Sequence, residues 1–317
     1  MEKTTRIWAF LLLGATSLCG LARAEVLPEL EITRVSESVY SAIGATAAPT
    51  YENAGHNNNL SFIVTSAGVV VVNGGDNYQL AAALHRQIKK YTAQPVKWLV
   101  NENGQGHAFL GNSYWSEQGV SIIAHEDAIV EMKEKGASVL SQMQRRNREK
   151  AAGTSLVLPS HSFGCESGDS YVIEMGGTSI ELLRFGPAHS PGDISVWLPE
   201  QRILIAGDIA FHQRLLAIFP YTDVAGWIAS FAKMAALQPA LVVPGHGSPT
   251  NMPALERDTL GYLIFLRGEI VRILDAEGDL AEAYQIDQSA YSQLATFDEL
   301  AGKNAGRLYQ MMELDYF

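Results

Sequence analysis

Cysteine is almost absent from this chain of 317 residues, which contains only Cys19 and Cys165. Cys19 lies in an N-terminal segment that we expect to be removed, so Cys165 would remain alone and an intramolecular disulfide is excluded. Stability must then come from a packed core, and from a bound metal if the chain holds one.

Basic residues are also few, with 23 Lys and Arg against 34 Asp and Glu and a formal net charge of −11. A chain of this charge repels nucleic acid and anionic membrane surfaces, so we expect a small-molecule substrate and no nucleic-acid partner. After the N-terminal segment, no apolar run reaches the roughly 20 residues that a membrane span needs. We therefore expect no membrane-spanning segment.

The N-terminus has the three parts of a secretory signal. Lys3 and Arg6 precede an apolar run over residues 7–13, and the small-residue motif Ala22-Arg23-Ala24 follows. This order predicts a signal peptide over residues 1–24 that is cleaved after Ala24, and a periplasmic or secreted protein.

Short apolar runs bounded by turn residues predict strands in the first half, at residues 39–42, 60–65, 69–73, 96–100 and 121–124. The valines of residues 69–72 show no polar alternation, which predicts a strand covered on both faces. Helical spacing of apolar residues predicts helices over 77–91 and 111–118. This alternation of strands and helices indicates a layered α/β fold.

The second half begins with a charged helix over residues 126–152. Further strands are expected at residues 171–174, 179–183, 194–198, 203–207 and 241–244, with a helix at 225–236. Glycine turns and hairpin spacing indicate antiparallel or mixed pairing. From residue 253 onward the pattern is helical, so we expect one domain over residues 25–250 and a helical extension over 251–317.

Four loops carry residues with metal-ligand chemistry. His189 lies in Ala-His-Ser-Pro-Gly-Asp, Asp208 follows Ala-Gly, and His246 lies in Pro-Gly-His-Gly, each beside an apolar strand-like run. His107 ends a polar, glycine-rich loop that starts at Asn101. Imidazoles and a carboxylate are suitable ligands for zinc or non-haem iron.

These motifs, in this order and at these separations, resemble the metallo-β-lactamase superfamily. The resemblance covers residues 31–250 and implies a four-layer αββα sandwich with one or two metals at one edge of its two sheets. The region around residues 304–309 is similar to that of exported members grouped with quinoprotein relay-system and sulfur-oxidation metallohydrolases.

The first metal loop departs from the family pattern His-x-His-x-Asp-His. An ungapped match places Asn103, Gln105, His107 and Ala108 at the four ligand positions. A match shifted by one residue places His107 at the last His and Gly106 at the Asp, and we prefer it because it keeps an imidazole at an imidazole position. In both alignments at least two of the usual ligands are absent. Asn73 also replaces the Asp that usually supports the loop.

The resemblance implies His107, His189, Asp208 and His246 as metal ligands, with Asp208 and His107 as the catalytic pair. His56, Asn103 and Gln105 are the expected substrate contacts. We expect one ion, zinc in the first place and iron as the alternative, because neutral amides replace imidazoles in the first loop.

The expected function is an exported, mononuclear metallohydrolase acting on an ester, thioester, lactone or related small substrate. Antibiotic hydrolysis is not favoured, because the first loop lacks ligands that those enzymes generally use. Two alternatives remain: a non-catalytic periplasmic protein that binds a ligand or partner, and an iron-dependent redox or sulfur-handling enzyme.

Overall fold

The computed structural model describes residue 27, residues 29–164 and residues 168–316. The predicted signal peptide and Cys165 lie outside the described residues. Within the described part, no helix is long and apolar enough to cross a membrane.

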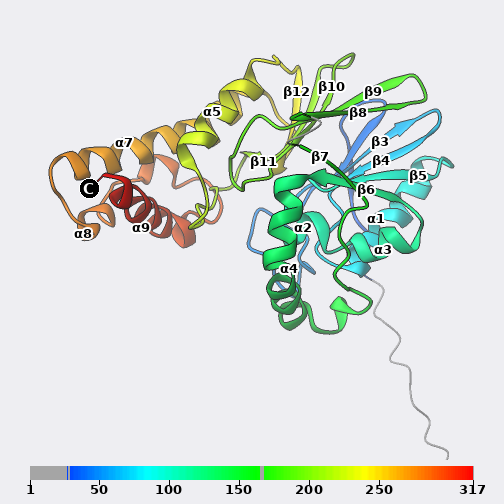
Figure 1. Ribbon diagram of the computed structural model, residues 1–317, viewed down its shortest axis with the longest axis horizontal. Coiled ribbons are helices and arrows are strands. Elements are labelled where there is room, and N and C mark those ends of the chain that lie inside the picture. Colours follow the sequence, from blue (N-terminus) through cyan, green and yellow to red (C-terminus); the bar gives the residue numbers. More distant parts are fainter. Residues whose placement is uncertain (1–26, 28, 165–167, 317) are drawn as a thin grey trace, which may run out of the picture.

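Two mixed sheets form the centre of the fold (Figure 1). The first sheet keeps chain order, and its strands are β1 (Ile32–Arg34), β2 (Val39–Ala42), β3 (Leu60–Thr65), β4 (Gly68–Val72), β5 (Val96–Val100), β6 (Ser121–His125) and β7 (His161–Phe163). The second sheet has the order β12-β11-β10-β9-β8, from β8 (Ser170–Met175), β9 (Thr178–Leu183), β10 (Ser195–Leu198), β11 (Ile203–Phe211) and β12 (Leu241–His246). Pairing is antiparallel along β1 to β4 and β8 to β11, and parallel along β4 to β7 and between β11 and β12.

Strand β4 explains how the layers are held together. Val70 and Val72 pack between the two sheets, whereas Val69 and Val71 pack toward the helices on the other face. Those helices include α1 (Tyr78–Tyr91) and α3 (Asn112–Glu117). The valine run is therefore buried on both faces, as its lack of alternation predicted.

Helix α5 (Val224–Ala235) packs on β11 at the outer face of the second sheet, which completes the predicted αββα layers, and the C-terminal helices extend from α5 away from the sheets (Figure 1). The extension contains α6 (Met252–Leu255), a π-helical turn (Glu256–Leu260), α7 (Gly261–Asp275), α8 (Leu280–Ala283), a 3₁₀ turn (Ser289–Tyr291) and α9 (Phe297–Tyr316). One buried cluster joins Leu204 of β11 and Trp227 of α5 to Leu266 of α7 and Leu308 of α9. The extension therefore shares its core with the sheet.

The structure differs from the sequence expectations mainly at element ends. β1, β7 and α2 (Gly106–Phe109) were not predicted, since each has only three or four residues. The helix expected over 126–152 is α4 (Glu126–Asn147) followed by a 3₁₀ turn at Arg148–Ala151. β11 continues past the expected end to Phe211, because register shifts around Gly207 let the strand bend and remain paired with β12.

The shared core gives a stability prediction. Leu266→Ala removes a fully buried side chain, so we expect the free energy of unfolding to fall by about 2–5 kcal/mol. Because the extension and sheet share one core, denaturant unfolding followed by circular dichroism will remain a single transition. The matched variant Ile264→Ala, on the same helix but 53% exposed, will change stability by less than about 0.5 kcal/mol. Two separate transitions in Leu266→Ala would show that the extension folds independently.

Candidate metal centre

Asp208 lies at the centre of a buried cluster at one end of the two sheets. Its Oδ2 is 3.3 Å from His107 Nε2 and 3.8 Å from His189 Nε2, and its Oδ1 is 3.3 Å from His246 Nε2. All four side chains are buried. The structure thus brings together the four residues that the sequence predicted as ligands, from helix α2, the loop after β9, and strands β11 and β12.

Glycines allow the strands to approach each other this closely. A Cβ on Gly245 would lie 2.3 Å from Asp208 Oδ1, and one on Gly207 would lie 2.2 Å from Glu102 Oε2. Gly207 also has a φ of +62°, a conformation that favours glycine. The Ala-Gly-Asp and Pro-Gly-His motifs are therefore needed for the carboxylate to face the imidazoles.

Glu102 is the residue that the sequence interpretation missed. Its Oε1 lies 3.4 Å from His107 Nε2, and single donor atoms of Glu102, His107 and Asp208 all lie within 4.8 Å of one another. The available signal was an acidic residue two positions after the buried strand β5, in the same loop as His107. The family pattern His-x-His-x-Asp-His has no Glu position, so the resemblance did not predict a role for Glu102.

Burial and neighbouring charges shift the pKa values of the residues in this cluster. Burial raises the pKa of Glu102 to about 7. Burial opposes charge on His107, but the Asp208 and Glu102 carboxylates outweigh it and raise the pKa of His107 to about 10. Burial also acts to raise the pKa of Asp208, yet His107 and His246 hold it well below its usual range. Without a metal, protonated His107 is the positive charge that faces the two buried carboxylates, and a bound cation would take the place of that proton.

Unpaired atoms test whether the site fits a metal. Both carboxylate oxygens of Glu102, Nε2 of His107 and Oδ1 of Asp208 are buried and have no hydrogen-bond partner among the described residues. Buried polar atoms are normally hydrogen-bonded, so four such atoms in one cluster require an explanation. Carboxylate oxygens and imidazole nitrogens are ligands for zinc and iron, and a divalent cation here would satisfy them.

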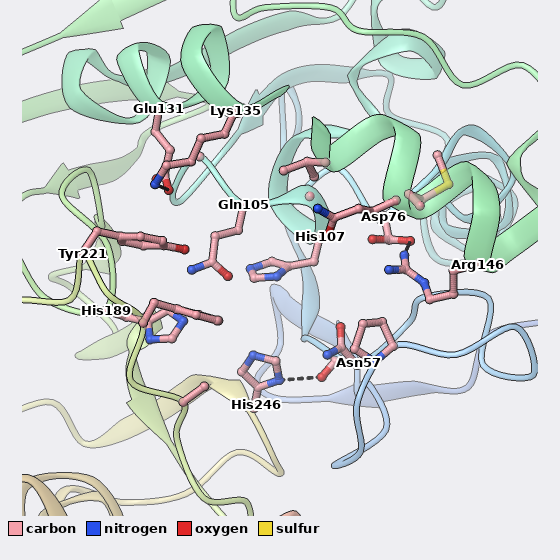
Figure 2. Close-up of a pocket in the computed structure, with 18 of the residues that line it drawn as sticks. Asn57, Asp76, Gln105, His107, Glu131, Lys135, Arg146, His189, Tyr221 and His246 are labelled. Carbon is pink, nitrogen blue, oxygen red and sulfur yellow. Dashed lines mark hydrogen bonds and ion pairs between the residues drawn. The ribbon is translucent and has the colours of Figure 1, made fainter. Parts of the chain in front are cut away.

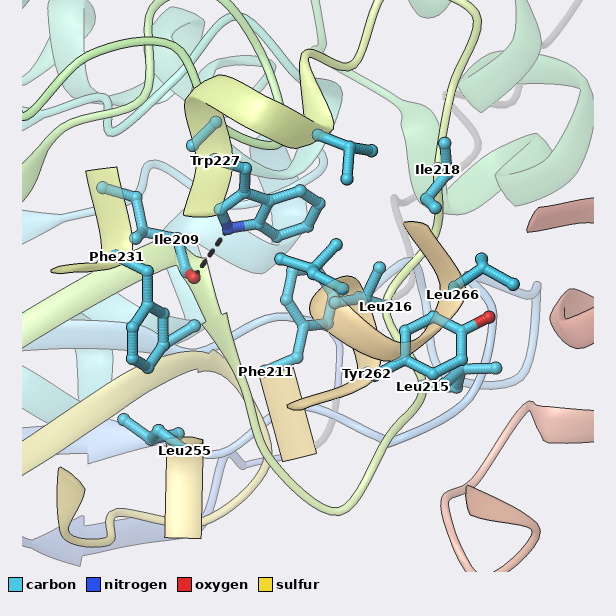
Figure 3. Packing of buried hydrophobic residues seen from close by; sticks show 14 of the residues in the cluster. Ile209, Phe211, Leu215, Leu216, Ile218, Trp227, Phe231, Leu255, Tyr262 and Leu266 are labelled. Atoms are coloured by element: carbon cyan, nitrogen blue, oxygen red, sulfur yellow. Dashed lines mark hydrogen bonds between the residues drawn. The ribbon is translucent and has the colours of Figure 1, made fainter. Parts of the chain in front are cut away.

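The rings of His189 and His246 are oriented by their surroundings. His189 packs against Phe211, Phe219 and Trp227 at ring-centroid distances of 5.1–5.3 Å, and burial lowers its pKa to about 4. The indole nitrogen of Trp227 donates to Ile209 O at 2.9 Å, which fixes this aromatic wall (Figure 3). A neutral imidazole held in one orientation is suited to metal binding.

His246 Nδ1 lies 2.5 Å from Asn57 O and 2.9 Å from Arg214 Nη1. A carbonyl only accepts and a guanidinium only donates, so this one nitrogen cannot satisfy both. In the tautomer that leaves Nε2 free for a metal, Nδ1 carries the proton and donates to Asn57 O.

Asn103 and His56 are placed differently from the expected substrate contacts. Asn103 is fully buried, and its Nδ2 donates to Asp193 Oδ1 at 3.1 Å and to Asp208 Oδ2 at 3.2 Å. It holds the carboxylate of Asp208 and is not part of the cavity lining. His56 turns its Nε2 toward Ala42 O at 3.3 Å and does not line the cavity either. In both cases a local partner takes the polar atoms.

Gln105 is the one expected substrate contact that faces the cavity. The cavity has a volume of about 300 Å³, and the Gln105 amide lies in it near His107, His189 and Tyr221 (Figure 2). Its Nε2 is buried without a partner among the described residues. The opposite wall is charged and includes Glu131, Lys135 and Arg146 of α4.

Asn73 supports the first loop although it brings no charge. Its φ of +70° is a left-handed conformation that Asn tolerates, and its Oδ1 accepts from Glu102 N at 3.4 Å. The amide thus fixes the backbone at Glu102.

Comparisons with known proteins identify a family and a fold that this chain resembles. The family described as the Metallo-beta-lactamase superfamily matches residues 110–246. The chain is 26% identical over 239 residues to a metallo-beta-lactamase type 2 of Bacteroides fragilis, a match that covers 70% of this chain and 81% of the relative. It is 22% identical to a linear primary-alkylsulfatase of Pseudomonas sp. (strain ATCC 19151), covering 62% of this chain and 44% of that enzyme.

Solved structures share the fold. A metallo-beta-lactamase from Pontibacter korlensis has a TM-score of 0.61 at 21% identity and covers 74% of this chain and 99% of its own. A metallo-beta-lactamase from Pseudomonas aeruginosa, in a mono-zinc form, has a TM-score of 0.60 at 18% identity and covers 76% of this chain and 97% of its own. The family model, the curated relative and the solved structures together support the metallo-beta-lactamase superfamily of metallohydrolases, the family that the loop motifs resemble.

Proposed function

We propose that the chain is a hydrolase with a single metal ion, zinc in the first place, acting on an ester, thioester or lactone. His107, Asp208 and His246 would hold the ion, with Glu102 and His189 beside it. The observation that carries the proposal is the convergence of these side chains on Asp208, together with buried ligand-type atoms that form no hydrogen bond among the described residues. Two imidazoles and a carboxylate also bind ferrous iron, so the experiment below compares zinc with iron.

The single ion follows from the two amides in the first loop. Both Nδ2 hydrogens of Asn103 point to carboxylates, and its Oδ1 accepts from Gln105 N at 3.0 Å. Asn103 thus uses both N–H groups and one lone pair of its oxygen within the protein, which favours a supporting role over that of a metal ligand. Gln105 alone does not make a second site among the described residues.

The reaction is a hydrolysis without redox chemistry. Water adds to the carbonyl carbon, the bond to the leaving oxygen or sulfur breaks, and an acid plus an alcohol or thiol are formed. When bound, a divalent metal lowers the pKa of water toward ~7 and polarises the carbonyl. Gln105 Nε2 is placed to donate to the substrate oxygen as its charge grows, while the rings of Phe219 and Tyr221 shield the cavity.

The metal proposal is tested by stoichiometry. The purified chain, loaded with zinc or iron and dialysed, will retain about one equivalent of one metal by elemental analysis. Glu102→Gln will weaken binding at least about tenfold, because it removes an anionic oxygen donor from the cluster. Glu131→Gln, a second buried carboxylate in the cavity, will keep normal affinity. Less than about a tenth of an equivalent in the unaltered chain would overturn the proposal.

Activity is tested with an ester, p-nitrophenyl acetate, and a thioester, S-phenyl thioacetate. The metal-loaded chain will hydrolyse at least one of them, and Asp208→Ala will abolish turnover together with metal binding. Gln105→Ala will lower kcat/KM about tenfold or more while metal content stays at one equivalent, since it removes only a donor to the developing oxyanion. Equal rates for Gln105→Ala and the unaltered chain would remove Gln105 from the mechanism.

We also propose that the protein is exported, which the N-terminal pattern of Lys3, Arg6 and Ala22-Arg23-Ala24 supports. In a bacterial host, mass spectrometry of the protein recovered from the periplasm will show Glu25 as the first residue. Replacing both Lys3 and Arg6 with Glu will slow export and leave the uncleaved chain in the cytoplasm. An uncleaved N-terminus in the unaltered protein would contradict this proposal.

A further inference from the structure

A second hollow, of about 560 Å³, lies on the C-terminal extension between residues 220–225 and helices α7 and α9. Its lining is mostly aliphatic and includes Val224, Val271, Leu308, Met311, Met312 and Leu314. Leu314 is 83% exposed, and Met311 and Met312 are half-buried. We call this hollow the aliphatic groove.

The aliphatic groove and the metal cavity lie on two sides of one loop. Tyr221 lines both of them. The next residue, Thr222, lines the groove and donates its hydroxyl hydrogen to His189 O at 2.9 Å. The groove thus lies directly behind a candidate ligand, and Tyr221 stands at the boundary between the two hollows.

The two hollows have complementary chemistry. The metal cavity is lined by charged groups that include Asp76, Glu131, Lys135, Arg146 and Arg214. Small-molecule sites are usually lined mainly by apolar side chains, with a few polar groups that fix orientation. The metal cavity supplies charged and polar groups for such a site, and the aliphatic groove would add apolar surface beyond that of the cavity itself.

Resting on the hydrolase function proposed above, we propose that the substrate is an amphiphilic ester whose aliphatic chain lies in the aliphatic groove. Its carbonyl would lie in the metal cavity and its chain would pass Tyr221. The Tyr221 ring is held by Lys135, whose Nζ is 3.4 Å from its centroid, and by stacking on Phe219 at 5.4 Å. Two methionines suit a flexible chain, because their unbranched side chains adapt to its shape.

The test is the dependence of kcat/KM on chain length, using p-nitrophenyl esters from acetate to dodecanoate below their micelle-forming concentrations. Full burial of a methylene corresponds to about a fourfold gain, so we expect at least a twofold rise per methylene until the groove is filled. Met312→Glu will flatten this rise without changing turnover of the acetate. Ile264→Glu, at an exposed apolar residue of α7 outside the groove, will keep the normal rise. If Met312→Glu fails to fold, Leu314→Glu replaces it.

Binding of laurate by calorimetry separates this inference from the proposed function. If no ester is hydrolysed, yet laurate binds the full chain and Met312→Glu weakens it tenfold, the groove inference stands and the hydrolase proposal fails. Ester hydrolysis with a flat chain-length profile, or the same profile in Met312→Glu, would overturn the groove inference. So would a dimer in sedimentation that Met312→Glu dissociates, because the groove would then be a self-association surface.

Discussion

The buried carboxylate of Asp208 is the constraint on which the rest of the site depends. Removing a carboxylate from water is costly unless cations or donors surround it. Here His107, His246 and Asn103 all reach its two oxygens. That requirement explains the glycine at 245, whose missing Cβ leaves room for Asp208 Oδ1, and it explains why strand β11 bends where it does. A divalent metal bound here would extend the same compensation with a stronger charge.

Asn59 links the first sheet to the part of the second sheet that carries this cluster. Asn59, at the start of β3, donates from Nδ2 to Pro244 O at 2.8 Å and to Gly247 O at 2.7 Å, while its backbone N–H donates to Gly245 O at 2.8 Å. The first sheet therefore fixes the loop of the second sheet that carries His246. Aromatic packing does the same for His189, since Trp227 and Phe211 belong to the core shared with the extension. The ligands are carried by loops and strand ends, but the rigid layers position them.

Periodicity and motif spacing were sufficient for the layers and for most of the cluster. The valines of β4 showed their double burial directly, and Asp208, His189 and His246 occur in motifs whose glycines mark close approach. What the sequence could not show is which polar atoms find partners within the protein. Asn103 and His56 were predicted to contact substrate because amide and imidazole side chains often do. In the structure Asn103 donates to Asp193 and Asp208, and His56 lies against Ala42 O. Glu102 looked like a loop residue, and only the fold shows that both its oxygens lack partners among the described residues. Pairing of this kind depends on residues far apart in sequence.

Asn103 also changes how the incomplete first motif should be interpreted. If an amide had merely replaced an imidazole ligand, its polar atoms would face the cavity, as those of Gln105 do. Instead, Asn103 joins Asp193 to Asp208, and burial raises the pKa of Asp193 well above its usual value. An imidazole at this position has one N–H on each side of its ring at most, so it could not donate to both carboxylates in the same way. The amide therefore supports the Asp208 carboxylate, and Asn103→His, which restores the family residue in the ungapped alignment, would remove at least one of the two hydrogen bonds that this amide donates.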